Sequence, residues 1–145
     1  MKKIIIIVIS ILLVGFLSII LVNYLGNSNN NHDTSQAKNI LFINYGADEV
    51  NDINVYFGEE TYYISKMEKE NINYISVLDK EYELVLMVEE NKVKDVKEIT
   101  KSEATLGYKY DKLIYEVKEK NKDGYNYTYY NALDGELIKK IKTNR

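Results

Sequence analysis

A serine and a lysine three residues apart, Ser35 and Lys38, have the spacing in this chain that most resembles a catalytic motif. S-x-x-K is the nucleophile motif of penicillin-binding proteins and serine β-lactamases. The nearest match to their second motif, K-T-G, is Lys142-Thr143-Asn144, and 145 residues are too few for those folds. The single histidine, His32, lies in a polar segment without a rigid partner. We therefore predict that the chain is not an enzyme and has no catalytic residue.

Carboxylates recur in pairs, at Asp79/Glu81 and at Asp134/Glu136. Glycoside hydrolysis needs two carboxyl groups that face each other across a cleft, whereas these pairs lie at expected turns. Aspartate side chains accept hydrogen bonds from backbone amides in turns, so Asp79, Asp134 and Gly135 are interpreted as turn residues. A weak divalent-cation site is the alternative. The prediction is that the chain holds no metal and no cofactor.

Tyrosines dominate the segment YNYTYYNALDGELIKKI, residues 125–141. On a strand, Tyr125, Tyr127 and Tyr129 point to one face and Tyr130 to the other. One interpretation is that they form cross-strand pairs in a core without tryptophan. The other is that some remain exposed as a recognition surface, because tyrosine combines a large contact area with a hydrogen-bonding hydroxyl group. Tyr74 joins these three as a partner-binding candidate.

The N-terminal segment is apolar. Residues 4–22 carry no charge and follow Lys2 and Lys3. As a helix they span about 28 Å, close to the thickness of a bilayer core. We predict a single-pass transmembrane anchor over residues 1–22, with the N-terminus in the cytoplasm and the rest of the chain outside. A cleaved signal peptide is the alternative. The absence of cysteine excludes a thioether lipid anchor and disulfides.

The part predicted to lie outside is acidic. Apart from Lys2 and Lys3, 17 basic residues stand against 22 acidic ones. This balance argues against binding nucleic acid or an anionic membrane surface by electrostatic attraction.

The remaining chain divides by its patterning. Residues 23–36 are polar and aperiodic, as in a flexible linker. Thr34 or Ser35 then caps a predicted helix in which Ala37, Ile40, Leu41 and Asn44 share a face, and Gly46 ends it. Residues 99–108, where Ser102 could cap a turn, are the candidate for a second helix, which we expect to be short or missing because Gly107 follows closely. Period-two runs predict strands at 53–57, 61–68, 71–78, 82–89, 112–120, 125–132 and 136–142.

The two halves repeat. At a constant offset of 55 residues, Tyr74, Leu78, Asp79 and Glu81 match Tyr129, Leu133, Asp134 and Glu136. The repeat predicts two tandem units, residues 37–98 and 99–145. We expect an α+β fold of cystatin-like units, each an antiparallel sheet with a helix on one face, the helix of the second unit being short or missing.

These residues resemble a known family. The segments GEETYYISK (58–66) and YEVKEKNKDGYNYTYYNALDGE (115–136), behind an anchor and a helix, are similar to the YpmB-like, or TseB-like, cell wall elongation regulators of Gram-positive bacteria. The resemblance implies two cystatin-like units related to PepSY domains. It differs in one respect, since family members open their second unit with a full helix.

The resemblance also implies a function. Family members are associated with a class B penicillin-binding protein, so the expected role is regulation of cell wall elongation at the outer side of the cell membrane by binding such a partner. Two alternatives remain. PepSY-related and cystatin-like domains are linked to control of proteases, for which addition of a strand to a sheet edge is a physical route. The tyrosine face could also bind peptidoglycan.

Overall fold

A computed structural model describes residues 14–16, 18 and 33–144. The chain divides after residue 36, and the architecture below is that of residues 37–145. Within the described residues, no helix is both long and apolar enough to cross a bilayer. The predicted anchor, residues 4–22, lies almost entirely outside them.

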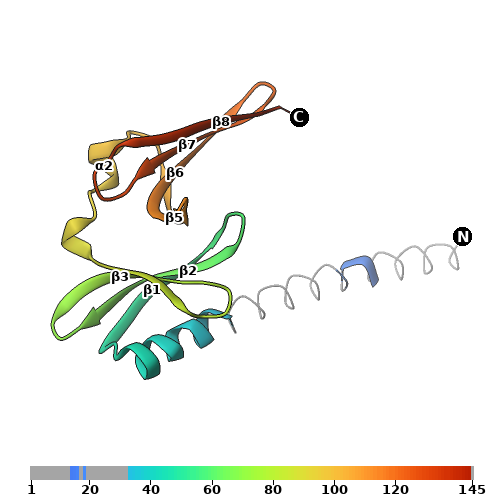
Figure 1. Ribbon diagram of the computed structural model, residues 1–145. Helices are drawn as coiled ribbons and strands as arrows, with labels where there is room; N and C mark the ends of the chain where they lie inside the picture. Colours follow the sequence, from blue (N-terminus) through green and yellow to red (C-terminus); the bar gives the residue numbers. More distant parts are fainter. Residues whose placement is uncertain (1–13, 17, 19–32, 145) are drawn as a thin grey trace, which may run out of the picture. The chain divides into compact units, whose positions relative to one another are not determined.

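Two antiparallel four-stranded sheets account for most of this part of the chain (Figure 1). In each sheet the strands follow one another in sequence order. The predicted antiparallel sheet for each repeat is therefore confirmed. Sheet 1 consists of β1 (Glu49–Phe57), β2 (Thr61–Lys69), β3 (Ile72–Leu78) and β4 (Leu84–Glu89). Sheet 2 consists of β5 (Ala104–Lys109), β6 (Lys112–Asn121), β7 (Gly124–Asn131) and β8 (Leu137–Asn144).

A helix covers one face of sheet 1. Ala37 and Leu41 are buried on it and pack with Met67 and Leu78 of the sheet. Tyr45, four residues after Leu41, is half-buried in the same cluster, whereas the predicted Asn44 is exposed. The reason is the i, i+4 spacing, which brings residue 45 back to the sheet side. The helix ends as predicted at Gly46, whose φ of +67° suits a glycine.

The start of this helix differs from the prediction. Residues 33–36, expected to belong to the flexible linker, are already helical. Thr34 and Ser35 therefore lie inside the helix and do not cap it. The apolar face of the helix begins only at Ala37, so the turn before it has no side chain to bury and can consist of polar residues.

The second unit has almost no helix. The helix of the second unit, expected to be short or missing within residues 99–108, is missing there, because Ala104–Lys109 forms β5 and pairs along its whole length with β6. Between the two sheets lie a 3-10 turn, η1 (Glu90–Lys92), and one helical turn, α2 (Val96–Ile99). The cap of α2 is Asp95, whose carboxylate accepts the backbone amide of Lys97. Ser102 is no cap, since its hydroxyl group donates to the Glu119 carboxylate and a strand follows it. Pairing with β6 gives hydrogen-bond partners to backbone N–H and C=O groups that a short helix would leave without partners.

The repeated aspartates organise equivalent turns. Asp79 Oδ1 accepts the backbone amides of Glu81 and Glu83, at 3.0 and 2.9 Å. Asp134 Oδ1 accepts the amide of Glu136 at 2.8 Å, and Gly135 has a φ of +80°. In both repeats, therefore, an aspartate lies in the turn that leads to the last strand of the sheet.

We expect Asp134→Ala to lower the free energy of unfolding by about 1 to 2 kcal/mol, because it removes an amide acceptor and the partner of the Asn131 side chain. Urea denaturation measures the change. Asp123→Ala is the matched control, since its carboxylate accepts no hydrogen bond from the described residues. Equal effects of the two substitutions would contradict the turn role.

The two sheets share a core. Tyr56 from β1 and Ile75 from β3 pack in one buried cluster with Ile114 from β6 and Tyr129 from β7. The Tyr56 hydroxyl donates to Glu116 Oε2 at 2.8 Å. Tyr56 thus connects the first sheet to the second, both by its buried ring and by this hydrogen bond. The sequence pattern does not distinguish Tyr56 from the other tyrosines.

Candidate functional site

Tyrosines and lysines of sheet 2 gather on one face, which we call the tyrosine–lysine face. The register of the strands explains the grouping, because Tyr127 lies opposite Lys118 on β6 and opposite Ile141 on β8. Residues directly opposite in an antiparallel sheet share a face. The members of this face are Lys109, Tyr110, Lys118, Tyr125, Tyr127, Tyr129 and Lys139.

Lys118 is central to the outer part of this face. Its Nζ lies 4.6 Å from the ring centroid of Tyr125 and 5.5 Å from that of Tyr127. The two ring centroids are 6.3 Å apart. Both rings are half-buried, so each offers part of its surface to a partner. An ammonium group over two phenol rings is a fixed positive charge on an aromatic platform.

Tyr129 belongs to the inner part of the face. It is only 5% exposed, and its ring meets Tyr110 edge-on at a centroid distance of 6.0 Å. Lys109 lies over both rings, 5.4 Å from Tyr110 and 5.2 Å from Tyr129. The structure thus brings Tyr125, Tyr127 and Tyr129 together, but Tyr129 contributes mainly to the core.

Tyr74 lies elsewhere. It is on β3 of sheet 1, opposite Met67 and Glu89, and packs half-buried against the cluster under the helix. The sequence repeat aligns Tyr74 with Tyr129, yet the two rings have different surroundings, because Tyr74 packs under the helix on sheet 1 and Tyr129 packs between the two sheets. Tyr74 therefore forms no common surface with the tyrosines of β7.

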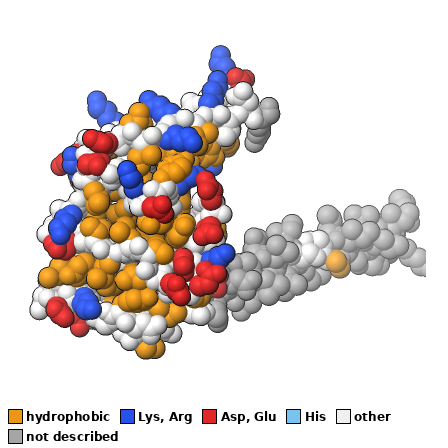
Figure 2. Space-filling view, in the orientation of Figure 1, with side chains coloured by type: hydrophobic (Ala, Val, Ile, Leu, Met, Phe, Trp, Pro, Cys, Tyr) orange, Lys and Arg blue, Asp and Glu red, His pale blue; other side chains and the backbone are white. Residues whose placement is uncertain are grey.

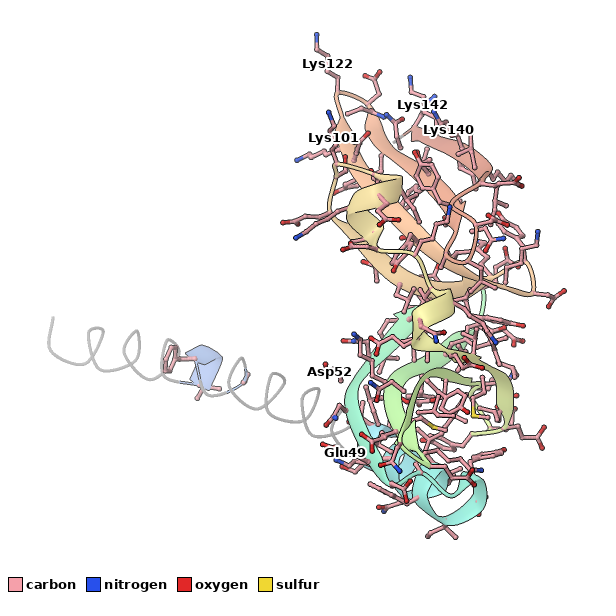
Figure 3. The ribbon with its side chains drawn as sticks, turned by 90° about the vertical axis from the view of Figure 1, so that its left-hand side faces the viewer. Glu49, Asp52, Lys101, Lys122, Lys140 and Lys142 are labelled. Carbon is pink, nitrogen blue, oxygen red and sulfur yellow. The ribbon has the colours of Figure 1, made fainter. Side chains whose placement is uncertain are left out.

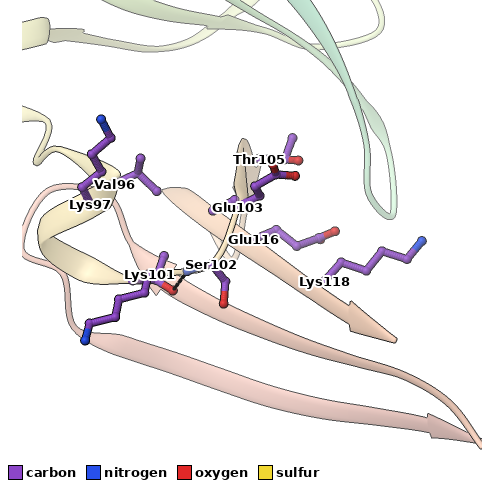
Figure 4. Close-up of a pocket in the computed structure, with 10 residues that line it drawn as sticks. Val96, Lys97, Lys101, Ser102, Glu103, Thr105, Glu116 and Lys118 are labelled. Carbon is purple, nitrogen blue, oxygen red and sulfur yellow. Dashed lines mark hydrogen bonds between the residues drawn. The ribbon is translucent and has the colours of Figure 1, made fainter. Parts of the chain in front are cut away.

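An open groove adjoins the tyrosine–lysine face (Figure 4). It has a volume of about 830 Å³, shares Lys118 with that face and is also lined by Glu116. Lys97 and Lys101 add two more cations, and Glu103 adds a carboxylate. Its remaining lining residues are small or polar: Val96, Thr100, Ser102, Ala104 and Thr105.

None of these lysines was a predicted site residue. Lys118 could have been found, since a hairpin closed at residues 121–124 places it opposite Tyr127. Lys97 and Lys101 gave no such signal, because α2 and the loop after it, rather than a strand register, place them at the groove. Chemically, the groove and the face offer cations, hydroxyl groups and aromatic rings. Among the described residues, no group of three histidine or acidic side chains is placed to hold a metal ion.

Glu116 connects this site to the core. Burial raises the pKa of Tyr56 well above its ordinary value, and the hydrogen bond to the Glu116 carboxylate raises it further. Burial also raises the pKa of Tyr129, with a further contribution from Glu116. Both phenols therefore stay protonated in the folded chain at a pH where exposed tyrosines ionise.

This arrangement predicts a loss of stability in alkali. In the unfolded chain the two phenols ionise near pH 10, so above that pH the unfolded state binds fewer protons than the native state and stability falls as pH rises. Below about pH 9 the contribution is fully present. Urea denaturation between about pH 8 and 12 should show this decline, and it should be shallower in Tyr56→Phe. Parallel curves for the two proteins would contradict the assignment.

Charges are divided unequally between the sheets. Residues 37–98 contain seven basic and fourteen acidic side chains, whereas residues 99–145 contain ten basic and seven acidic ones. Lys101, Lys122, Lys140 and Lys142 lie on the second sheet and its loops, and Glu49 and Asp52 on the first (Figure 3). In the view of Figure 2, hydrophobic side chains reach the surface between charged ones.

Comparisons with known proteins give a likeness of fold. No family model and no curated protein matches the sequence. The solved structure of the YpmB protein from Bacillus subtilis matches with a TM-score of 0.57 and 20% identity, over 67% of this chain and 87% of that chain. A Clostridium difficile 630 protein described as a lipoprotein matches with a TM-score of 0.36 and 15% identity, over 77% and 93%. The first match confirms the predicted YpmB-like resemblance at the level of fold.

Proposed function

Starting from the YpmB-like fold of this chain, we propose that it is a non-enzymatic, extracytoplasmic regulator of cell wall elongation. It acts by binding a class B penicillin-binding protein. Residues 4–22 anchor it in the cell membrane as a single-pass helix with the N-terminus in the cytoplasm. Confinement to the same membrane raises the effective concentration of the two proteins, so a modest interface suffices.

The tyrosine–lysine face is the observation that carries this proposal. Tyr125 and Tyr127 are half-buried rings under one ammonium group. Tyrosine is enriched at protein interfaces, where a few large anchors supply most of the binding energy. The groove beside Lys118 admits side chains of the partner. In this arrangement Tyr125 and Tyr127 contact the partner, while Tyr129 and Tyr74 stabilise the fold by packing in its two clusters.

Cross-linking in living cells tests the proposal. The tagged full-length chain is cross-linked, isolated from membranes, and its partners are identified. We expect a class B penicillin-binding protein to be enriched, and Tyr127→Ala combined with Lys118→Ala to remove most of it. Phe57→Ala is the matched control, since Phe57 is 71% exposed on sheet 1. A partner that survives the double substitution would exclude this face.

Control of a protease is the second candidate function. It is favoured by the outer edge of β4, an apolar strand that pairs on one side only. Such an edge can accept an extended segment of a protease. The regulator proposal predicts no inhibition of extracytoplasmic proteases by the purified chain, whereas this candidate predicts dose-dependent inhibition. Binding to purified peptidoglycan without any protein would instead favour a glycan-binding role for the tyrosines.

A further inference from the structure

Each sheet has two edge strands, and two of the four edges are protected by the fold. β1 carries a bulge between Asn51 and Asn54, with Asp52 at a φ of +49°, and such irregularities discourage pairing. The outer edge of β5 lies next to sheet 1, since Thr105 and Leu106 line a common pocket with Ile64 and Ile75. β4 and β8 remain as edges that pair on one side only.

The β4 edge is apolar at its centre and acidic at its ends. Its sequence LVLMVE contains five successive apolar residues, and none of its six side chains is fully buried. Val85 and Met87 are 39% and 40% exposed. Glu83 precedes the strand and Glu89 ends it. No lysine or proline interrupts this edge, although those are the residues that usually prevent a strand from pairing further.

The β8 edge is basic. Its sequence LIKKIKTN carries Lys139, Lys140 and Lys142, and none of its eight side chains is fully buried. Among the described residues, no carboxylate lies within ion-pair distance of these three lysines. Leu137 adds an apolar side chain that is 53% exposed. The strand therefore combines unpaired backbone groups with uncompensated positive charge.

We propose that β8 of one copy of this chain pairs with β4 of a second copy, so that sheet 2 of the first continues into sheet 1 of the second. The lysines of β8 then meet the glutamates that flank β4, and the backbone groups of both edges are satisfied. This interface shares Lys139 with the tyrosine–lysine face, but it does not depend on the function proposed above.

Charge decides between this pairing and its alternatives. Two β4 strands together would bring Glu83 and Glu89 of both copies close, and two β8 strands would bring their lysines close. Like charges across a strand pair are destabilising. The mixed pairing is head-to-tail, so each added copy leaves one free β4 and one free β8, and chains of more than two copies can form.

The contact is a weak one. A ladder of six residues buries less than the roughly 1,200 Å² that stable complexes bury. Its ion pairs are exposed, so salt weakens them. We therefore expect an association that is concentrated by confinement to a surface and is best detected by covalent trapping.

Disulfide trapping provides the test. Because the chain has no cysteine of its own, only the introduced cysteines can form disulfides. Three single-cysteine variants of the full-length chain are prepared in detergent: Met87→Cys, Leu137→Cys and Thr143→Cys. The first is mixed with either of the other two, with empty micelles in large excess. These last two positions mark opposite ends of β8, so one is near Met87 whichever way the strands run. Mild oxidation of the mixture should give dimers joined between β4 and β8, and a chain with both cysteines should give a ladder.

Two controls distinguish specific pairing of β4 with β8 from random collision between copies. Ile43→Cys, 81% exposed on the helix, should cross-link poorly with Met87→Cys. Lys140→Glu with Lys142→Glu should reduce the β4–β8 product by about fivefold or more, because attraction becomes repulsion. Adding Glu83→Lys and Glu89→Lys to the other copy should restore it.

Three outcomes would overturn the inference. One is equal trapping at Ile43. Another is a dominant product between two copies of Met87→Cys. The third is no product at all, with the β8 lysines instead needed for binding vesicles that contain anionic phospholipid.

Discussion

Gly107→Ala should lower the free energy of unfolding by about 3 kcal/mol, because the added methyl group has no space. A Cβ at this position would lie 2.6 to 2.8 Å from three ring carbons of Tyr56. The ring cannot simply move away, since it is buried between the sheets and its hydroxyl is bonded to Glu116. Urea denaturation at neutral pH measures the loss.

A double-mutant cycle identifies the cause. If the Tyr56 ring is what the methyl group meets, Gly107→Ala should cost little in a Tyr56→Ala background, and the two effects should not add. Additive effects would show instead that β5 needs glycine for its own backbone. The cycle also tests the contact between β1 and β5 on which the shared core depends.

Tyr129→Ala should be nearly as damaging, with a loss of about 3 to 5 kcal/mol, the usual range for a large aromatic residue in a core. Tyr129 is 5% exposed and packs with Tyr56 and Ile114. Tyr125→Ala, two residues away on the same strand face, should cost about 1 kcal/mol or less. Thermal unfolding of the two variants at the same pH compares them.

The contrast separates the two possible roles of the tyrosines. Partner binding by Tyr129→Ala should fall only as far as its folded fraction falls, whereas Tyr125→Ala should lose binding while remaining folded. If Tyr125→Ala unfolds as readily as Tyr129→Ala, the whole row belongs to the core and no tyrosine of β7 remains as a partner contact.

The repeat at an offset of 55 residues made much of the fold predictable. Period-two patterns placed seven of the eight strands, and the aspartates marked corresponding turns. β5 was missed because its short sequence ATLGYK contains a glycine and pairs with a strand that follows it closely. The need for Gly107 could not be predicted either, since the ring that requires it belongs to Tyr56, far earlier in the chain.

The candidate site was predictable only in part. Alternation in the sequence placed Tyr125, Tyr127 and Tyr129 on one face, but it could not tell which of them the first sheet would cover. That distinction depends on how two sheets share a core, which no local pattern encodes. The groove beside Lys118 is built by α2 and the loop before β5, where the sequence pattern is ambiguous.

Site-specific photo-cross-linking is the most direct measurement of the central claim. A photoreactive phenylalanine analogue replaces Tyr127 in the full-length chain, and the same analogue at Phe57 on sheet 1 serves as the control. Irradiation of living cells should link a class B penicillin-binding protein to position 127 and not to position 57. Capture of that protein equally from both positions, or of none from position 127, would contradict binding through the tyrosine–lysine face.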